Sequence, residues 1–187
     1  MKNFLKKFSD SSKELTNVRT LAVCAMMLAL RIVLGVFGNF TLAVVPFVKI
    51  GFTFIPIVIT AYLFGPVCAA IVSGAGDILA IFLANPTAFS VTPGITVCCV
   101  IEGLIYGAVL YRAELKLPTV IIAKAAVLLL CHLPMNTLVL CFLMNMPYLT
   151  LLGYRAAVLV PFAAVEVAII MLIKKPLVRV SEQLHKQ

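Results

Sequence analysis

Seven ionisable side chains and one amide fall inside long apolar stretches of this chain, and they are the residues that could do chemistry. In a hydrocarbon environment such a group costs at least a few kcal/mol unless it is paired or faces water. Each is therefore a functional candidate. The set is Arg31, Asp77, Glu102, Lys124, His132, Asn136, Arg155 and Glu166.

We expect four of these residues to line one outward-facing pocket for an anionic or zwitterionic small molecule. Arg31 and Arg155 offer guanidinium forks that match carboxylates. Asp77 and Asn136 could pair with the ring nitrogens of a heterocycle. Lys49 would stand at the mouth of the pocket.

Structural roles stay open for the seven ionisable groups. Arg31 and Asp77 could form one internal ion pair, and Arg155 could snorkel to the outer interface. Lys124, near an inner helix end, could snorkel or meet a partner. The remaining three residues could form hydrogen bonds between helices. Alternatively, they could form the active site of a small intramembrane enzyme. These three are Glu102, His132 and Glu166.

No catalytic or metal-binding motif supports the enzyme alternative, so we expect no catalytic residue, no metal and no cofactor. A Walker A sequence is also absent, and an ATP-driven role would therefore need a nucleotide-binding partner. The six cysteines all fall in apolar runs without zinc or redox spacing, which predicts that they are small apolar fillers.

Composition decides which elements must position these residues. Of the 187 residues 63% are hydrophobic and 12% charged, against roughly 45–50% and about 25% in soluble domains. A spanning helix needs roughly 20 apolar residues, and continuous apolar runs favour helices over a barrel. We therefore predict an all-α membrane protein, a bundle of six transmembrane helices, with Pro134 interrupting the fifth. The apolar segments are Thr20–Gly38, Ile50–Phe64, Val67–Ala84, Ile95–Tyr111, Val120–Met144 and Leu151–Ile173.

Basic residues predict the orientation of the bundle. Eleven of the 15 Lys and Arg residues lie in the N-terminal stretch, one loop and the C-terminal tail. The positive-inside rule then places both termini in the cytoplasm. The whole chain, 1–187, reads as one domain, with residues 1–19 and 174–187 as cytoplasmic segments. Nothing at the N-terminus resembles a signal peptide.

Two further features could serve transport or only packing. Ala22, Ala25 and Ala29 share a face of the first segment, and this small-residue spacing lets another helix approach closely. A similar small-residue stretch lies at 69–76. The loops 39–49 and 85–94 carry Phe, Pro, Thr and Asn rather than charge, so they could close over a cavity or simply connect helices.

Several short motifs, in order along nearly the whole chain, resemble the folate-type substrate-binding component of energy-coupling-factor (ECF) vitamin transporters. The first is Asn17-Val18-Arg19-Thr20, and the last is Arg155 with Pro161. Between them lie Ala29–Gly35, Phe37–Phe40, Phe64-Gly65-Pro66, Gly76–Leu79, Pro93–Thr96, Gly103–Gly107 and Asn136-Thr137.

The resemblance implies a non-enzymatic subunit in the bacterial plasma membrane that captures a vitamin, here folate or a related pterin, at its outer face. It also implies a membrane coupling subunit, docked on the face of Ala22, Ala25 and Ala29, and two cytoplasmic ATPases. A pteridine needs flat stacking partners, for which Phe37 and Phe89 are the first candidates, before Phe40 and Tyr148. Other cargoes stay open: pantothenate, thiamine or riboflavin. So does a scaffold subunit with no ligand.

Overall fold

The computed structural model describes residues 7–8, 11–12, 14–37, 39–41, 49–84, 93–144 and 147–185. Helices dominate it, and five are long and apolar enough to cross a membrane. The first elements are α2 (Val18–Phe37), β1 (Asn39–Thr41), β2 (Lys49–Gly51), α3 (Phe54–Phe64), α4 (Pro66–Ala84) and α5 (Pro93–Leu110). One interrupted helix follows, made of α6 (Leu117–Val127), the π-helix η2 (Leu128–Met135) and α7 (Asn136–Met144), and then α8 (Tyr148–His185).

Each predicted apolar segment coincides with a helix, which confirms the helical part of the prediction. The second segment is the exception in length, because α3 has 11 residues and is too short to cross a membrane unaided. Pro134 does interrupt the fifth segment, but as a π-helix and not as a break. The polar tail is also helical, since α8 continues to His185.

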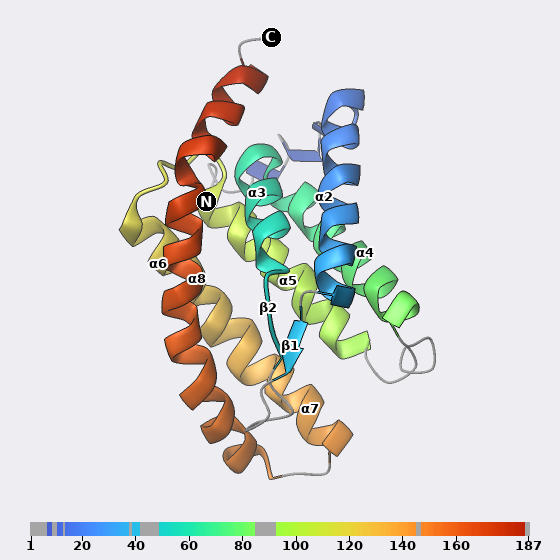
Figure 1. Ribbon diagram of the computed structural model, residues 1–187, viewed down its shortest axis with the longest axis vertical. Coiled ribbons are helices and arrows are strands. Elements are labelled where there is room, and N and C mark those ends of the chain that lie inside the picture. The colour runs from blue at the N-terminus through green and yellow to red at the C-terminus, as the bar shows by residue number, and fades with distance from the viewer. Residues whose placement is uncertain are drawn as a thin grey trace.

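The architecture is helical as predicted, and the connection between α2 and α3 adds two short strands that the prediction did not include. Asn39–Thr41 pairs antiparallel with Lys49–Gly51, with Phe40 opposite Ile50. Aromatic and β-branched residues in this stretch favour extended backbone. In Figure 1 the strands lie between α3 and α7.

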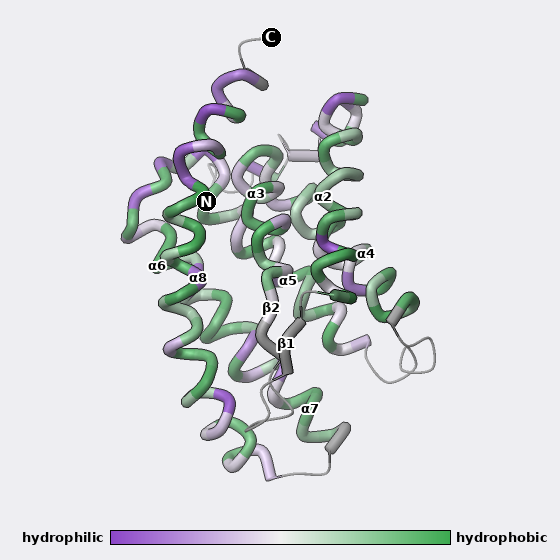
Figure 2. Tube along the Cα trace, in the orientation of Figure 1, coloured by the Kyte–Doolittle hydropathy of each residue, from purple (hydrophilic) through white to green (hydrophobic). Residues whose placement is uncertain are grey.

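The helices run alternately between two ends of the bundle. We call the end with the start of α2, the α3–α4 turn, the α5–α6 connection and the end of α8 the tail end (Figure 1). The opposite end, with the strands and the start of α8, is the hairpin end. Hydrophilic residues gather at the tail ends of α2 and α8, whereas hydrophobic residues cover most of the helices in between (Figure 2).

Small residues let α4 and α5 approach closely. A Cβ added at Gly103 would lie 2.7 Å from the Ala69 carbonyl oxygen, and one at Gly107 would lie 2.2 Å from the Pro66 Cα. Ala69 is fully buried there. The small-residue stretch of α4 is therefore used for internal packing. The alanines of α2 differ, because Ala22, Ala25 and Ala29 are all exposed.

A short N-terminal segment is tied to the tail end. The fully buried Ser11 hydroxyl donates to the Phe64 carbonyl oxygen at 2.7 Å and accepts the Val67 N–H at 3.1 Å. These two groups flank Gly65, whose φ of +89° is accessible to glycine at little steric penalty. Ser11 thus satisfies backbone groups where α3 ends and α4 begins.

Candidate functional site

Arg31 is buried inside the bundle although α2 otherwise presents many exposed apolar residues. Its side chain is 5% exposed, and its Nη1 donates to the Thr53 carbonyl oxygen at 3.3 Å, just before α3. Gly76 on α4 makes room for it, since a Cβ there would lie 2.4 Å from the Arg31 Cδ. The Nε has no partner among the described residues. The guanidinium is thus held through Nη1, while its Nε donor stays unused within the described part of the chain.

Asp77, on α4, faces α5 and not Arg31. Its Oδ2 accepts a 2.8 Å hydrogen bond from the Thr96 hydroxyl. Within the described part of the chain, Asp77 and Arg31 form no ion pair at 4.0 Å or less. The alternative of one internal Arg31–Asp77 pair is therefore wrong, and Arg31 remains a buried cation without a carboxylate partner there.

Arg155 repeats this arrangement on α8. It is 4% exposed, so it does not snorkel to the surface, and its Nη2 donates to the His132 carbonyl oxygen at 3.3 Å. Its Nε has no partner within the described ranges, and neither has the buried Oδ1 of Asn136, which begins α7. Arg155 and Asn136 thus retain hydrogen-bonding capacity in a buried setting, where an unsatisfied polar group is costly.

The four predicted site residues occupy similar positions along their own helices. Each lies about two helical turns from the hairpin end of its own helix. They come from α2, α4, α7 and α8, and within the described ranges no hydrogen bond or ion pair joins any two of them. Two guanidinium groups with spare donors could bind carboxylates, and the Asn136 amide could bind a ring edge.

The other buried acidic and basic side chains that the structure describes lie next to one another in pairs. Lys124 on α6 and Glu166 on α8 form an ion pair with side chains 6% and 9% exposed. His132 Nε2 lies 3.8 Å from Glu102 Oε1. Because Glu166 is engaged with Lys124, these contacts do not form the Glu–His–Glu cluster of the intramembrane-enzyme alternative. No three metal-ligating side chains gather among the residues described.

The aromatic candidates receive no support from packing. Phe37, the last residue of α2, is 81% exposed. Phe89 lies outside the described residues, as does the loop 85–92.

Sequence reasoning missed three contributors. Thr96 belongs to the Pro93–Thr96 motif, but its hydrogen bond to Asp77 depends on how α4 and α5 pack. The other two are the backbone carbonyls of Thr53 and His132. No side-chain pattern signals a carbonyl that is free to accept a bond.

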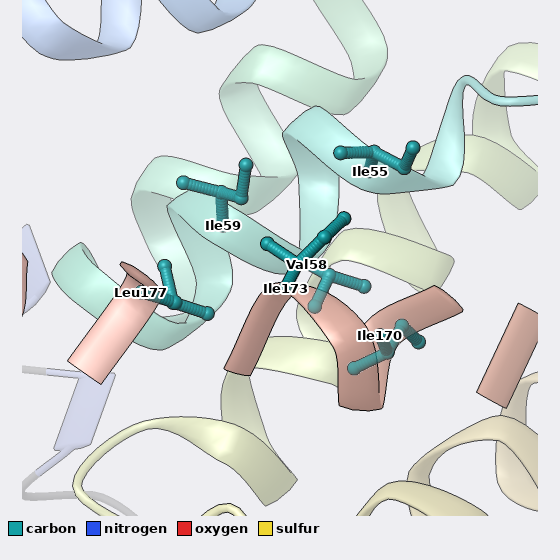
Figure 3. Close-up of a pocket in the computed structure, with 6 residues that line it drawn as sticks. All are labelled: Ile55, Val58, Ile59, Ile170, Ile173 and Leu177. Atoms are coloured by element: carbon teal, nitrogen blue, oxygen red, sulfur yellow. The ribbon is translucent and has the colours of Figure 1, made fainter. Parts of the chain in front are cut away.

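An apolar groove between α3 and α8 is a poor candidate for a polar cargo. In Figure 3 the side chains of both helices point toward one another, and none carries a polar atom. The lining residues are Ile55, Val58, Ile59, Ile170, Ile173 and Leu177.

Comparison with known proteins decides the family. Residues 19–178 match the family described as "ECF transporter, substrate-specific component". The chain belongs to this family. It is therefore a transport component and not an enzyme, and its long apolar helices make it a multi-pass membrane protein. The family resemblance inferred from the motifs is confirmed.

Two relatives of this ECF component carry a folate name. The chain is 31% identical over 121 residues to "Folate transporter FolT" of Clostridium novyi (strain NT), covering 65% of this chain and 67% of that protein. It also matches the "Crystal structure of FolT bound with folic acid" with a TM-score of 0.77 and 24% identity, over 86% of this chain and 95% of that one. The second likeness shows a shared fold.

Proposed function

We propose that this ECF component captures folate or a related pterin at the hairpin end of its bundle, with Arg31, Asp77, Asn136 and Arg155 in the site. The proposal rests on the burial and the hydrogen-bond partners of the two arginines. Both are buried, and among the described residues both bond a backbone carbonyl instead of a carboxylate and keep an Nε without a partner. Buried cations of this kind suit an anionic ligand. The relative named as a folate transporter supports the choice of cargo.

The same proposal includes the aromatic residues and the topology. Phe37 and Phe89 are proposed to stack on the pteridine ring. Six spans, with α3 as the second, would place both termini of one membrane domain in the cytoplasm and the site on the outer face of a bacterial plasma membrane.

Coupling to ATP hydrolysis is proposed to occur in partner subunits. The exposed face of Ala22, Ala25 and Ala29 would receive a membrane coupling subunit, since small residues allow close helix approach. Two cytoplasmic ATPases would complete the complex.

Calorimetric titration of the purified protein with folic acid tests the cargo and the site together. We expect binding by the wild type and a sharp loss with Arg155→Met. The matched control is Arg179→Met, the same change at an exposed position of the same helix. Absence of binding by any folate or pterin would overturn the cargo, and an unchanged affinity of Arg155→Met would remove Arg155 from the site.

Other vitamin cargoes are distinguished by mass spectrometry of the small molecule that co-purifies with the protein. Pantothenate, thiamine or riboflavin in place of a pterin would keep the transport role and replace the folate assignment. A protein that binds none of these ligands would favour the scaffold alternative.

A further inference from the structure

The interruption of the fifth span is an ordered π-helix built around a proline. Over Leu128–Met135 the backbone bonds widen, so that the Asn136 N–H donates to the Cys131 carbonyl, five residues back. Pro134 lies inside this segment. In a regular α-helix its ring would clash with the carbonyl of residue 130, and it has no N–H to donate. A wider turn relieves that conflict, and π-helical segments are frequent at functional sites.

The wide turn changes what the His132 carbonyl can bind. In an α-helix this oxygen would accept the Asn136 N–H, which here goes to Cys131 instead. The oxygen accepts two side-chain donors: the Thr137 hydroxyl at 3.5 Å and Arg155 Nη2 at 3.3 Å. Across the described part of the chain, this carbonyl is the hydrogen-bond partner that the structure gives to the Arg155 guanidinium.

We infer that Pro134 is a positioning residue of the binding site: by keeping Leu128–Met135 π-helical it leaves the His132 carbonyl open to hold the guanidinium of Arg155. This inference rests on the proposed function, because it assigns a purpose to Arg155 as a ligand contact. The carbonyl fixes one arm of a buried side chain, and the remaining donors are thereby aimed at a carboxylate of the ligand.

The decisive experiment measures the affinities for folic acid and for pterin, with Pro134→Ala made both in the wild type and in an Arg155→Met background. Pro134→Ala is expected to draw the segment toward an α-helix and occupy the His132 carbonyl with a backbone N–H. Affinity for folic acid should fall on the order of tenfold, the loss typical of one hydrogen bond to a charged group. Affinity for pterin, which has no carboxylate, should stay unchanged. In an Arg155→Met background, Pro134→Ala should cause no further loss.

The matched control is Pro161→Ala, a proline change at an exposed position inside α8, which should leave both affinities unchanged. The inference is overturned if Pro134→Ala binds folic acid as the wild type does, if it weakens pterin equally, or if its effect persists undiminished without Arg155. Should Pro134→Ala fail to fold, the same change combined with deletion of Leu130 restores the residue count of a continuous α-helix and is held to the same expectations.

Failure of the proposed function would look different. If Arg155→Met alone binds folic acid normally, the site itself is wrong at Arg155. If Arg155→Met loses affinity and Pro134→Ala does not, the positioning role alone is wrong.

Discussion

Two sets of buried charges in this molecule have different kinds of hydrogen-bond partner. Toward the tail end, Lys124 and Glu166 neutralise each other across α6 and α8. Toward the hairpin end, Arg31 and Arg155 are equally buried but bond the carbonyls of Thr53 and His132. A carbonyl holds a guanidinium in place without cancelling its charge.

The difference separates a structural role from a binding role. In a buried ion pair each charge already has its partner, so a charged ligand group would gain little electrostatic stabilisation there. A buried arginine without a carboxylate partner remains electrostatically unsatisfied, and an anionic ligand can supply what is missing. Changes to the first set should therefore alter stability, and changes to the second should alter affinity.

The largest effect is expected at the tail-end pair. Lys124→Met leaves Glu166 buried and uncompensated, which should lower the free energy of unfolding by about 3–5 kcal/mol. The double variant Lys124→Met, Glu166→Leu should recover most of that loss. Unfolding in mixed micelles measures both. A large loss of folic acid affinity in the double variant would break the distinction between the two sets.

Arg31→Met should have the opposite signature. One or two charge-assisted hydrogen bonds to the ligand would be lost, which corresponds to roughly 10- to 150-fold weaker binding. Stability should change little, because no carboxylate among the described residues would lose its ion-pair partner in this variant. Calorimetry measures the affinity, with Arg19→Met, at an exposed position of α2, as the control. Equal affinities of the two variants would exclude Arg31 from the site.

Gly76→Ala should disturb the site through its neighbour. The new Cβ would meet the Arg31 side chain, and this flexible chain must shift. Overpacking of about 1 kcal/mol corresponds to about fivefold weaker binding of folic acid. Gly153→Ala is the control, since outside its own helical turn no atom of the described residues lies within 4 Å of its added Cβ. Wild-type affinity of Gly76→Ala would show that the position of Arg31 is not critical.

The smallest effect is expected at Thr96. Thr96→Val removes the hydroxyl that donates to Asp77 and should weaken binding about threefold, as expected for one modest hydrogen bond. Thr119→Val, at the tail-end start of α6, serves as the control. If Thr96→Val and Asp77→Asn both bind folic acid normally, Asp77 has no part in the site.

The helical segments and the candidates for chemistry follow from the amino-acid sequence alone. Continuous apolar runs of spanning length favour helices over a closed barrel, because a hydrocarbon environment requires every backbone group to be paired within the protein. Charged residues within such runs are rare enough to stand out. Pro134 likewise predicted an interruption of its helix, because proline has no backbone N–H to donate. The family followed from short motifs in order.

Which charges pair depends on how the helices pack against one another. Lys124 and Glu166 are 42 positions apart in the chain, and nothing in their local sequence selects one partner over Glu102 or Asp77. The carbonyls that hold Arg31 and Arg155 could not be predicted from the sequence either, since every residue carries a backbone carbonyl. Helix packing and helix register determine which carbonyl can accept a bond from a side chain. Side-chain type sets what a residue can bind, but the approach of helices sets what it does bind.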